Sequence, residues 1–385
     1  MKSKLMAVLL FVSLLALANN LKPSGVSSAN PARDPRITYL GRHNSAGMMN
    51  WEGTGISVNL KGSKLNFTIK AYNNISKGLF LTCEEADIDI SPVAYSIFID
   101  GKKQSDFSIP KGTRCKNISV TMPDNGNIIH HVEIIKVSEA STDFETFEIA
   151  QKSSLATPAK TYRITYYGDS ITSGYVDSNN QPRNYSGFAC LPLSYAFKTT
   201  QNLNKALCKN LSRKAFNASY IALSGIGVAK SLPRWQGPTM FNYFRQVLYR
   251  IGPQMDFENA DIVVINIGTN DIVAGCTVEK YQTALDKFIS EVGKLNPKAH
   301  IFVTLWGFFD LKKQHPEFYS ALQETVKKYT PKHKEKVYFV EPYWSKSGVS
   351  CMHPSEKFAQ EFADYLTQII LKNIPSDMQA QSENS

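Results

Sequence analysis

The feature that most constrains this chain is a change in its hydrophobic pattern at Thr161. Before that residue, short stretches of alternating apolar and polar residues are separated by turns, which predicts an antiparallel β-sandwich of jelly-roll type over residues 36–150. After it, β-branched runs alternate with segments of helical period, which predicts a parallel sheet with helices on both faces over residues 161–375. The segment 151–160, with its Ser, Ala and Pro residues, is expected to link the two domains.

The sandwich strands are expected where apolar residues alternate, at residues 56–60, 65–69, 95–99, 118–122, 127–137 and 146–149. Asp100-Gly101 follows one of these runs directly and is a strong signal for a hairpin turn. His130 and His131 are adjacent on one expected strand, so they point to opposite faces and cannot readily share a metal ion. We therefore assign both histidines a structural role.

The α/β domain is expected to contain buried strands at residues 161–167, 219–223, 261–267, 300–305 and 336–340. Apolar residues recur every three or four positions from Val278 to Leu295, and this helix should end at Asn296-Pro297. The last helix is expected to begin at Pro354, because proline favours the first position of a helix.

Four loops that follow these strands begin with or contain small and polar residues: Gly168–Ser170, Ser224–Gly227, Gly268–Asp271 and Ser350–His353. The carboxyl ends of parallel strands meet at one edge of a sheet, so we expect these loops to converge there. Each of them alone also fits an ordinary turn, a helix cap or a closely packed glycine. Their joint occurrence indicates a functional site.

The residue types in these loops suit acyl transfer by a serine nucleophile. Ser170, lifted by a tight turn, is the candidate nucleophile, and His353 is the candidate base that accepts its proton. The backbone N–H groups of Ser170 and Gly225 and the side-chain amide of Asn270 are candidates for an oxyanion hole. Together they predict hydrolysis of an ester.

In this order the four loops resemble the SGNH, or GDSL-type, hydrolase superfamily, whose sequence blocks are named for Ser, Gly, Asn and His. The matching residues are Ser170, Gly225, Asn270 and His353, and the resemblance covers residues 161–374. It implies a flavodoxin-like, three-layer α/β fold and a serine esterase of the carboxylic ester hydrolase class. It also implies that no cofactor and no metal ion take part.

The order of the two domains looks like that of carbohydrate esterase family two. The sandwich carries Gly41-Arg42-His43 and Trp51–Ile56, and the α/β domain carries Gly-Asp-Ser-Ile-Thr-Ser-Gly-Tyr and Ser-Gly-Ile-Gly-Val. This resemblance implies an acetylxylan esterase-like enzyme that removes acetyl groups from plant polysaccharides such as xylan or glucomannan. The expected partner is therefore an acetylated polysaccharide or oligosaccharide.

The chain departs from the superfamily pattern three residues before His353, where an aspartate usually orients the imidazole. Ser350 occupies that position, and no acidic residue lies between Trp344 and His353. We therefore expect a Ser-His dyad in place of a triad. The nearby carboxylates Asp169 and Asp271 are expected to brace turns rather than to act in catalysis.

Three aromatic residues lie on or near the strand-to-helix connections: Tyr175, Trp235 and Trp306. Aromatic rings in such positions can face sugars, but they more often pack against the core. Packing is thus the favoured role for all three, and we leave them out of the catalytic set.

The N-terminus predicts secretion. The apolar run Leu5–Leu17 follows two lysines and is closed by Ala16-Leu17-Ala18, the pattern of a signal peptide at residues 1–18. The run is too short to span a membrane, so no membrane partner is expected. A leader at residues 19–35 and a tail at residues 376–385 are polar and are expected to be disordered.

Sequons and cysteines also suit an extracellular protein. The candidate glycosylation sites are Asn66, Asn74, Asn117, Asn184, Asn210 and Asn217. The six cysteines are an even number with no Cys-x-x-Cys spacing, which favours disulfides. One arrangement pairs Cys276 with Cys351, which would hold the loop of His353 against the loop of Asn270. The same arrangement pairs Cys83 with Cys115 and Cys190 with Cys208.

The formal net charge of +10 falls to +8 without the two lysines of the signal peptide, and the remaining lysines are scattered. This distribution lacks the clustered basic and aromatic residues of a nucleic-acid-binding surface. Three functions remain open: a secreted polysaccharide deacetylase, a GDSL-type short-chain esterase or lipase, and a non-catalytic carbohydrate-binding protein. The intact set of Ser, Gly, Asn and His argues against the third.

Overall fold

The computed structural model describes residues 34–71, 93–110, 113–137, 142–150, 152–158, 160–175, 190–208, 215–249, 251–307, 309–329, 336–345, 349–350, 353–376 and 378 of the 385-residue chain. The predicted signal peptide, nearly all of the leader and most of the tail lie outside these ranges, as do Asn74, Asn184 and Asn210. What the sequence indicates for those parts stays a prediction.

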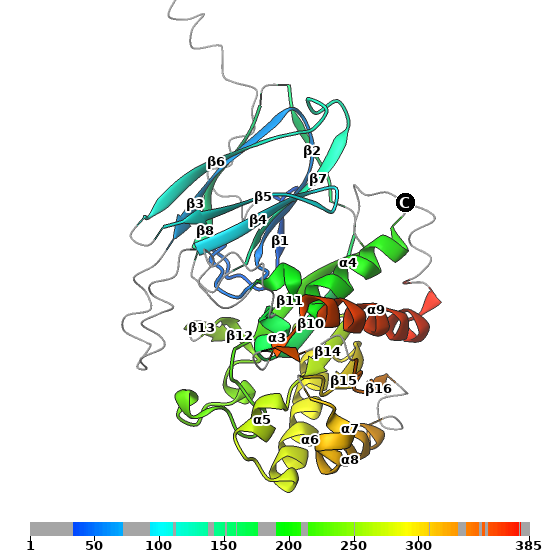
Figure 1. The fold of residues 1–385 in the computed structure, drawn as a ribbon. Helices are drawn as coiled ribbons and strands as arrows, with labels where there is room; N and C mark the ends of the chain where they lie inside the picture. Colours follow the sequence, from blue (N-terminus) through cyan, green and yellow to red (C-terminus); the bar gives the residue numbers. More distant parts are fainter. Residues whose placement is uncertain are drawn as a thin grey trace, which may run out of the picture.

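Two antiparallel sheets form the N-terminal domain, at the top of Figure 1. The six-stranded sheet has the order β1-β2-β7-β4-β5, with β9 paired to β2; its strands are β1 Thr38–Leu40, β2 Gly55–Lys61, β4 Val93–Ile99, β5 Lys102–Ile109, β7 Ile129–Lys136 and β9 Ser154–Ala156. The three-stranded sheet has the order β6-β3-β8, with β3 at Lys64–Ala71, β6 at Cys115–Thr121 and β8 at Thr142–Ile149.

Apolar side chains of the two sheets, among them Val58, Phe67 and Ile134, pack into one core. The chain crosses from one sheet to the other at most connections, as in a jelly roll. The predicted β-sandwich is therefore confirmed. Its predicted hairpin is also present, because Asp100 (φ 51°) and Gly101 (φ 74°) both adopt the left-handed conformation that a two-residue turn between β4 and β5 needs.

The predicted linker is partly a strand. Ser154–Ala156 forms β9 and pairs antiparallel with β2 from Asn59 to Lys61. This segment has too few alternating residues for a strand signal, and its pairing comes from the exposed backbone of β2 beside it. The linker is thus fixed to the sandwich at its centre.

A five-stranded parallel sheet organises the C-terminal domain, with the order β11-β10-β14-β15-β16. Its strands are β10 Tyr162–Gly168, β11 Phe216–Ala222, β14 Ile262–Asn266, β15 His300–Thr304 and β16 Val337–Phe339. β10 lies between β11 and β14, so its carboxyl end is flanked by the ends of both neighbours. The predicted parallel sheet is confirmed.

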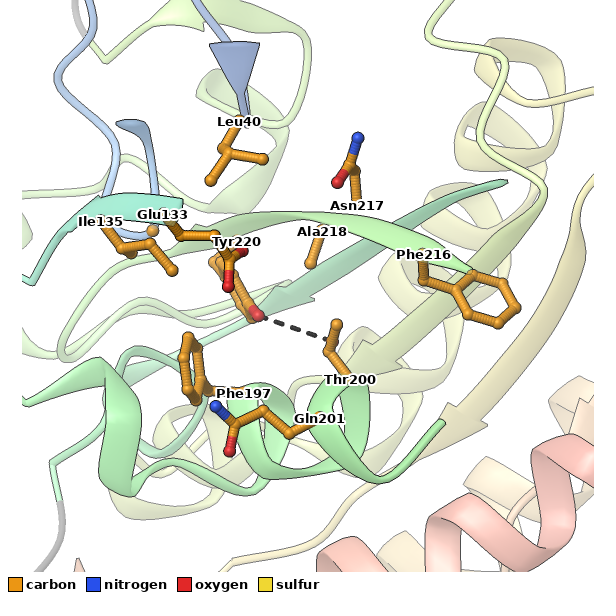
Figure 2. A pocket seen from close by; sticks show the side chains of 11 residues that line it. Leu40, Glu133, Ile135, Phe197, Thr200, Gln201, Phe216, Asn217, Ala218 and Tyr220 are labelled. Carbon is orange, nitrogen blue, oxygen red and sulfur yellow. Dashed lines mark hydrogen bonds between the residues drawn. The ribbon is translucent and has the colours of Figure 1, made fainter. Parts of the chain in front are cut away.

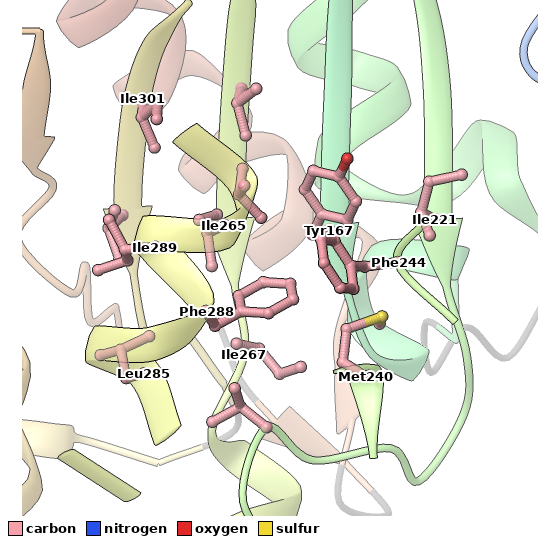
Figure 3. Close-up of a cluster of buried hydrophobic side chains, with 14 of the residues drawn as sticks. Tyr167, Ile221, Met240, Phe244, Ile265, Ile267, Leu285, Phe288, Ile289 and Ile301 are labelled. Carbon is pink, nitrogen blue, oxygen red and sulfur yellow. The ribbon is translucent and has the colours of Figure 1, made fainter. Parts of the chain in front are cut away.

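Helices cover both faces of this sheet, as predicted. The helices are α3 Ser170–Ser173, α4 Tyr195–Leu207, α5 Thr269–Val273, α6 Val278–Leu295, α7 Leu311–Gln314, α8 Pro316–Lys327 and α9 Glu356–Asn373. α4 and α9 pack on one face, where Tyr195 and Phe362 join the core, and α6 and α8 pack on the other. Figure 3 shows Leu285 and Phe288 of α6 against β14 and β10.

The predicted start of the last helix is wrong by two residues. α9 begins at Glu356, and Ser355 caps it by accepting a hydrogen bond from the Phe358 N–H. His353–Pro354 instead forms the short strand β18, which pairs with β17 at Val349–Ser350. Smaller elements complete the domain: the β12–β13 pair at Gln246–Leu248 and Ile251–Gln254, and 3-10 turns η3 Leu191–Leu193, η4 Pro233–Trp235 and η5 Met240–Asn242.

The two domains pack closely against each other. The rings of Phe98 and Phe197 lie 5.5 Å apart, and Leu40 and Ile135 of the sandwich join the core around α4 and α9. A cavity of about 30 Å³ lies at this junction, between β7 on one side and α4 and β11 on the other (Figure 2). This exceeds the roughly 10–15 Å³ of cavity volume that one water molecule needs.

One predicted disulfide is wrong. Cys190 is a buried free thiol, and the 13 residues of α4 separate it from Cys208. A helix of that length spans about 20 Å, whereas a disulfide requires Cα atoms within about 7 Å of each other. Cys115 and Cys276 are also free thiols, but their predicted partners Cys83 and Cys351 lie outside the described residues.

None of the helices within the described ranges combines the length and the apolar character that crossing a membrane requires.

Candidate active site

Ser170 lies at the carboxyl end of β10, where the strand turns directly into α3. Asp169 caps this helix, because its Oδ1 accepts a hydrogen bond of 3.0 Å from the Ile171 N–H. Gly168 is required by the turn, since a Cβ there would lie 2.1 Å from Thr172 Oγ1 and 2.8 Å from the Asn266 carbonyl oxygen. The turn therefore fixes the position of the Ser170 hydroxyl.

His353 reaches this hydroxyl from 183 residues further along the chain. Its Nε2 lies 3.0 Å from Ser170 Oγ, within hydrogen-bond distance. The backbone of His353 is held in register with Ser350 by the β17–β18 pair. The structure thus brings the two predicted residues into direct contact, and Ser350, at the position of the usual aspartate, is paired with His353 through the backbone.

The two predicted backbone donors lie in the loops that follow neighbouring strands, Ser170 after β10 and Gly225 after β11. Within the described part of the chain, neither the Ser170 N–H nor the Gly225 N–H donates a hydrogen bond. Gly225 is buried and has a φ of +77°, a conformation that favours glycine. Unpartnered buried donors are uncommon in proteins, and a pair of them next to a nucleophile is the arrangement that an oxyanion needs.

The side-chain amide of Asn270 is already engaged. Its Nδ2 donates to Asp169 Oδ2 at 3.1 Å and to the Ile226 carbonyl oxygen at 2.9 Å. An amide has two N–H groups, so an oxyanion would have to share one that already has an acceptor. Of the three predicted donors, Asn270 is therefore the one whose present hydrogen bonds must adjust.

The two aspartates brace turns, as predicted. Asp271 accepts hydrogen bonds from the N–H groups of residues 228, 229 and 230, which holds the loop after β11 against α5. Burial raises the pKa of Asp271 to about 6 despite these donors. Burial, together with the nearby charge of Asp271, raises the pKa of Asp169 to about 7, although the Ile171 N–H opposes this shift.

The three aromatic residues near the site have different surroundings. Trp306 is buried and stacks on Phe362 with 4.2 Å between ring centroids, so its predicted packing role is confirmed. Trp235 also packs, and its Nε1 donates to the Ser224 carbonyl oxygen at 2.9 Å. Tyr175 differs, because its ring lies against the imidazole of His353 with 5.3 Å between centroids.

The part of the chain that the structure describes contains no cluster of three or more His, Cys, Asp or Glu side chains that could hold a metal ion. His130 instead contacts two carboxylates, Asp100 and Asp124, at 2.7 Å each, and His131 contacts Asn59. Both histidines therefore have the structural role predicted for them.

A parallel sheet with a serine at the carboxyl end of a strand, within hydrogen-bond distance of a histidine, is the arrangement of a serine hydrolase of the α/β class. Comparison with known families agrees. The model of the GDSL-like lipase/acylhydrolase family matches residues 166–360, and the chain belongs to this family of carboxylic ester hydrolases. The model of the carbohydrate esterase 2 N-terminal domain matches residues 39–158, which covers the β-sandwich. The family resemblance expected from the sequence is confirmed.

Similar proteins share both domains. Cellulase/esterase CelE of Acetivibrio thermocellus is 28% identical over 337 residues, which are 82% of this chain and 36% of that protein. The chain therefore spans about a third of the length of this relative. The structure of a family two carbohydrate esterase from Clostridium thermocellum in complex with cellohexaose is 26% identical, with a TM-score of 0.69 over 87% of this chain and 98% of that one. A family two carbohydrate esterase from Cellvibrio japonicus, at 18% identity, a TM-score of 0.68 and coverage of 91% and 98%, shows the fold alone.

Proposed function

We propose that this protein is a secreted carbohydrate esterase that removes acetyl groups from plant polysaccharides such as xylan or glucomannan. The observation that carries the proposal is the 3.0 Å contact between Ser170 Oγ and His353 Nε2. The N–H groups of Ser170 and Gly225, which have no acceptor among the described residues, support it. A nucleophile, a base and oxyanion donors are the groups that hydrolysis of an ester requires.

In the first half of the reaction, His353 Nε2 takes the proton of the Ser170 hydroxyl while Oγ attacks the acetyl carbonyl carbon. The carbonyl oxygen becomes negative and accepts hydrogen bonds from the Ser170 and Gly225 N–H groups. The C–O bond to the sugar then breaks, and His353 returns the proton to the departing sugar hydroxyl. Ser170 now carries the acetyl group.

In the second half, water replaces the sugar. His353 takes a proton from the water, whose oxygen attacks the acetyl carbonyl, and the same donors stabilise the second negative intermediate. Breaking the bond to Ser170 Oγ releases acetic acid, and the serine recovers its proton from His353. Asn270 would add a third donor if its Nδ2 shifted from the Ile226 carbonyl oxygen toward the substrate.

A Ser-His dyad is part of this proposal. The chain offers no acidic residue between Trp344 and His353, and the backbone pairing of Ser350 with His353 fixes the histidine loop. A dyad without an acid needs other contacts to hold the imidazole in line with the serine.

Several features support a polysaccharide substrate. The relative that shares both domains is described as a cellulase/esterase, and a solved relative was determined with cellohexaose. Trp344, in the segment that leads to His353, is 41% exposed and packs edge-on against Phe358 of α9. An exposed indole is a suitable surface for stacking a sugar ring.

Secretion and glycosylation are also part of the proposal. The signal-peptide pattern at residues 1–18 supports export. Among the described sequons of the sandwich, Asn117 is exposed on β6, and Asn66, which is half-buried, lies on β3 opposite Ser119 of β6. Asn217 is less suited to a glycan, because it is half-buried and donates a hydrogen bond of 2.9 Å to Thr161 Oγ1.

The test compares acetate released from acetylated xylan and glucomannan with hydrolysis of short-chain and long-chain nitrophenyl esters. We expect the wild type to release acetate, and Ser170→Ala and His353→Ala each to lose about a thousandfold or more of kcat. Ser105→Ala, an exposed serine on β5, is the matched control and should keep full activity.

Other outcomes favour the alternatives. Cleavage of nitrophenyl esters, long-chain ones included, without acetate release from polymers would favour a general esterase or lipase. No hydrolysis of any ester, together with retained binding of polysaccharide, would favour a carbohydrate-binding protein whose catalytic function has been lost.

A further inference from the structure

The backbone of Tyr175 is tied to the nucleophile. Its N–H donates a hydrogen bond of 2.9 Å to the Ser170 carbonyl oxygen, and the Gly174 N–H donates to the same oxygen at 3.1 Å. Gly174 has a φ of +101°, and a Cβ there would lie 2.5 Å from the Cys190 carbonyl oxygen. The turn that follows α3 is therefore fixed, and it determines where the Tyr175 side chain leaves the backbone.

The Tyr175 ring lies against the imidazole of His353. The ring centroids are 5.3 Å apart and the planes are inclined by 30°, which is a tilted arrangement. The Nε2 of the same imidazole also lies 3.0 Å from Ser170 Oγ. One short segment, from Ser170 to Tyr175, thus supplies both a hydrogen-bond partner and an aromatic face to the same histidine.

We propose that Tyr175 is a positioning residue for His353, and that its aromatic face stabilises the imidazolium that forms when His353 takes the serine proton. This inference rests on the proposed esterase function. A cation within about 6 Å of an aromatic centroid is attracted to the π face, and 5.3 Å satisfies this condition. Tyr175 therefore does for the charged histidine part of what an aspartate does in a triad.

The chemistry of the two forms explains why the contact favours the reaction. Neutral imidazole gains only packing from the tyrosine ring, whereas imidazolium gains electrostatic attraction as well. The ring consequently favours the form of His353 that exists in the transition state over the resting form. The expected effect of losing the ring is roughly a threefold to thirtyfold fall in kcat.

Other titratable groups lie close to the same site. Asp169 caps α3, and burial together with nearby Asp271 raises its pKa to about 7; Asp271 on α5 has a pKa raised to about 6 by burial. The phenol of Tyr175 is itself titratable. A pH profile of the rate would combine these groups with His353, so the titration of the imidazole has to be followed directly.

The experiment compares wild type with Tyr175→Phe, Tyr175→Trp and Tyr175→Leu, using kcat and KM for nitrophenyl acetate and NMR titration of labelled histidine. His353→Gln identifies the resonance of His353. We expect the Phe and Trp variants to keep kcat within about threefold of the wild type, because both retain an aromatic face. The Leu variant should lose roughly threefold to thirtyfold in kcat with little change in KM, and its His353 titration midpoint should move to lower pH by about half a unit or more.

Tyr162→Leu is the matched control, because Tyr162 is half-buried at the opposite end of β10 and packs on Phe216. It should change stability without moving the His353 titration. An unchanged kcat and midpoint in Tyr175→Leu would overturn the proposal. So would a loss confined to KM for polysaccharide, which would make Tyr175 a sugar contact.

The titration also separates this proposal from the proposed function. If the wild type hydrolyses no ester, the esterase function fails, but the NMR comparison of Tyr175→Leu with wild type still measures whether the ring stabilises imidazolium. If the wild type is active and the midpoint does not move, only the role of Tyr175 fails.

Discussion

Asp169 connects the turn that carries Ser170 to Asn270 through its two carboxylate oxygens. Oδ1 accepts from the Ile171 N–H and fixes the turn that carries Ser170, while Oδ2 accepts from Asn270 Nδ2. The Asn270 amide in turn donates to the Ile226 carbonyl oxygen, next to Gly225. At the scale of single residues, the Asn270 amide therefore braces the site through hydrogen bonds to both loops, and its predicted role as an oxyanion donor remains to be tested.

Replacing Asn270 separates these two functions. We expect Asn270→Ala to lower kcat for nitrophenyl acetate by about a hundredfold or more with little change in KM, because an oxyanion donor acts mainly in the transition state. Asn202→Ala, which removes an exposed amide on α4 that donates to Asp364, should leave kcat unchanged. A variant with wild-type kcat and a lower free energy of unfolding would instead limit Asn270 to bracing.

At the scale of elements, His130 joins two turns of the sandwich. Its Nδ1 contacts Asp100 in the β4–β5 turn, and its Nε2 contacts Asp124 between β6 and β7, each at 2.7 Å. Burial lowers the pKa of His130, but the hydrogen bonds to the two carboxylates outweigh it and the net shift is upward. The hydrogen bond from His130 lowers the pKa of Asp124 to about 2.

This arrangement predicts that the sandwich loses stability as the pH rises. A histidine whose pKa is higher in the folded than in the unfolded protein stabilises the fold fully at pH values below its unfolded-state pKa of about 6.5. This stabilisation is lost as the pH rises through the folded-state pKa. We expect the free energy of unfolding, measured with urea, to fall between pH 6 and pH 9 more in wild type than in His130→Gln. Asp124→Asn, which keeps the imidazole and removes one carboxylate, should lie between them. Equal slopes in all three proteins would contradict this role of His130.

At the scale of the whole molecule, Arg42 connects the sandwich to the catalytic strand. The residue is buried, and its guanidinium donates to both carboxylate oxygens of Glu258 at 2.9 Å and to the Tyr167 hydroxyl at 3.1 Å. Tyr167 lies on β10 immediately before Gly168, and it donates to Glu258 at 2.6 Å. Arg42 therefore ties the β-sandwich to the strand that ends next to Ser170, and Figure 1 shows the sandwich adjoining the α/β domain.

Removing this arginine should destabilise both domains together. Arg42→Met leaves the Glu258 carboxylate buried without its partner, which typically costs about 3 to 5 kcal/mol of unfolding free energy. We expect urea unfolding followed by fluorescence and by circular dichroism to show one earlier, coincident transition. The double variant Arg42→Met with Glu258→Met, which removes both charges, should recover much of the loss. Two separate transitions, or an unchanged midpoint in Arg42→Met, would show that the domains do not depend on this contact.

Features that repeat along the chain could be predicted from the sequence. Period-two and period-three-to-four patterns place strands and helices correctly because they reflect which side of each element is buried. The positions of Ser170 and His353 follow from the same logic, since parallel strands end at one edge of a sheet. The pairing of Cys190 with Cys208 failed because cysteine spacing carries no information about the rigid helix between them.

The sequence by itself determined the two fold classes, the order of the domains and the loops that carry the site, because each leaves a local signal in the chain. Only the tertiary structure decided that Arg42 enters the second domain, that β9 joins the sandwich and that Tyr175 lies on His353. These contacts depend on how the helices and strands pack against one another. Packing brings together residues that are far apart in the sequence, and no local sequence pattern predicts such contacts.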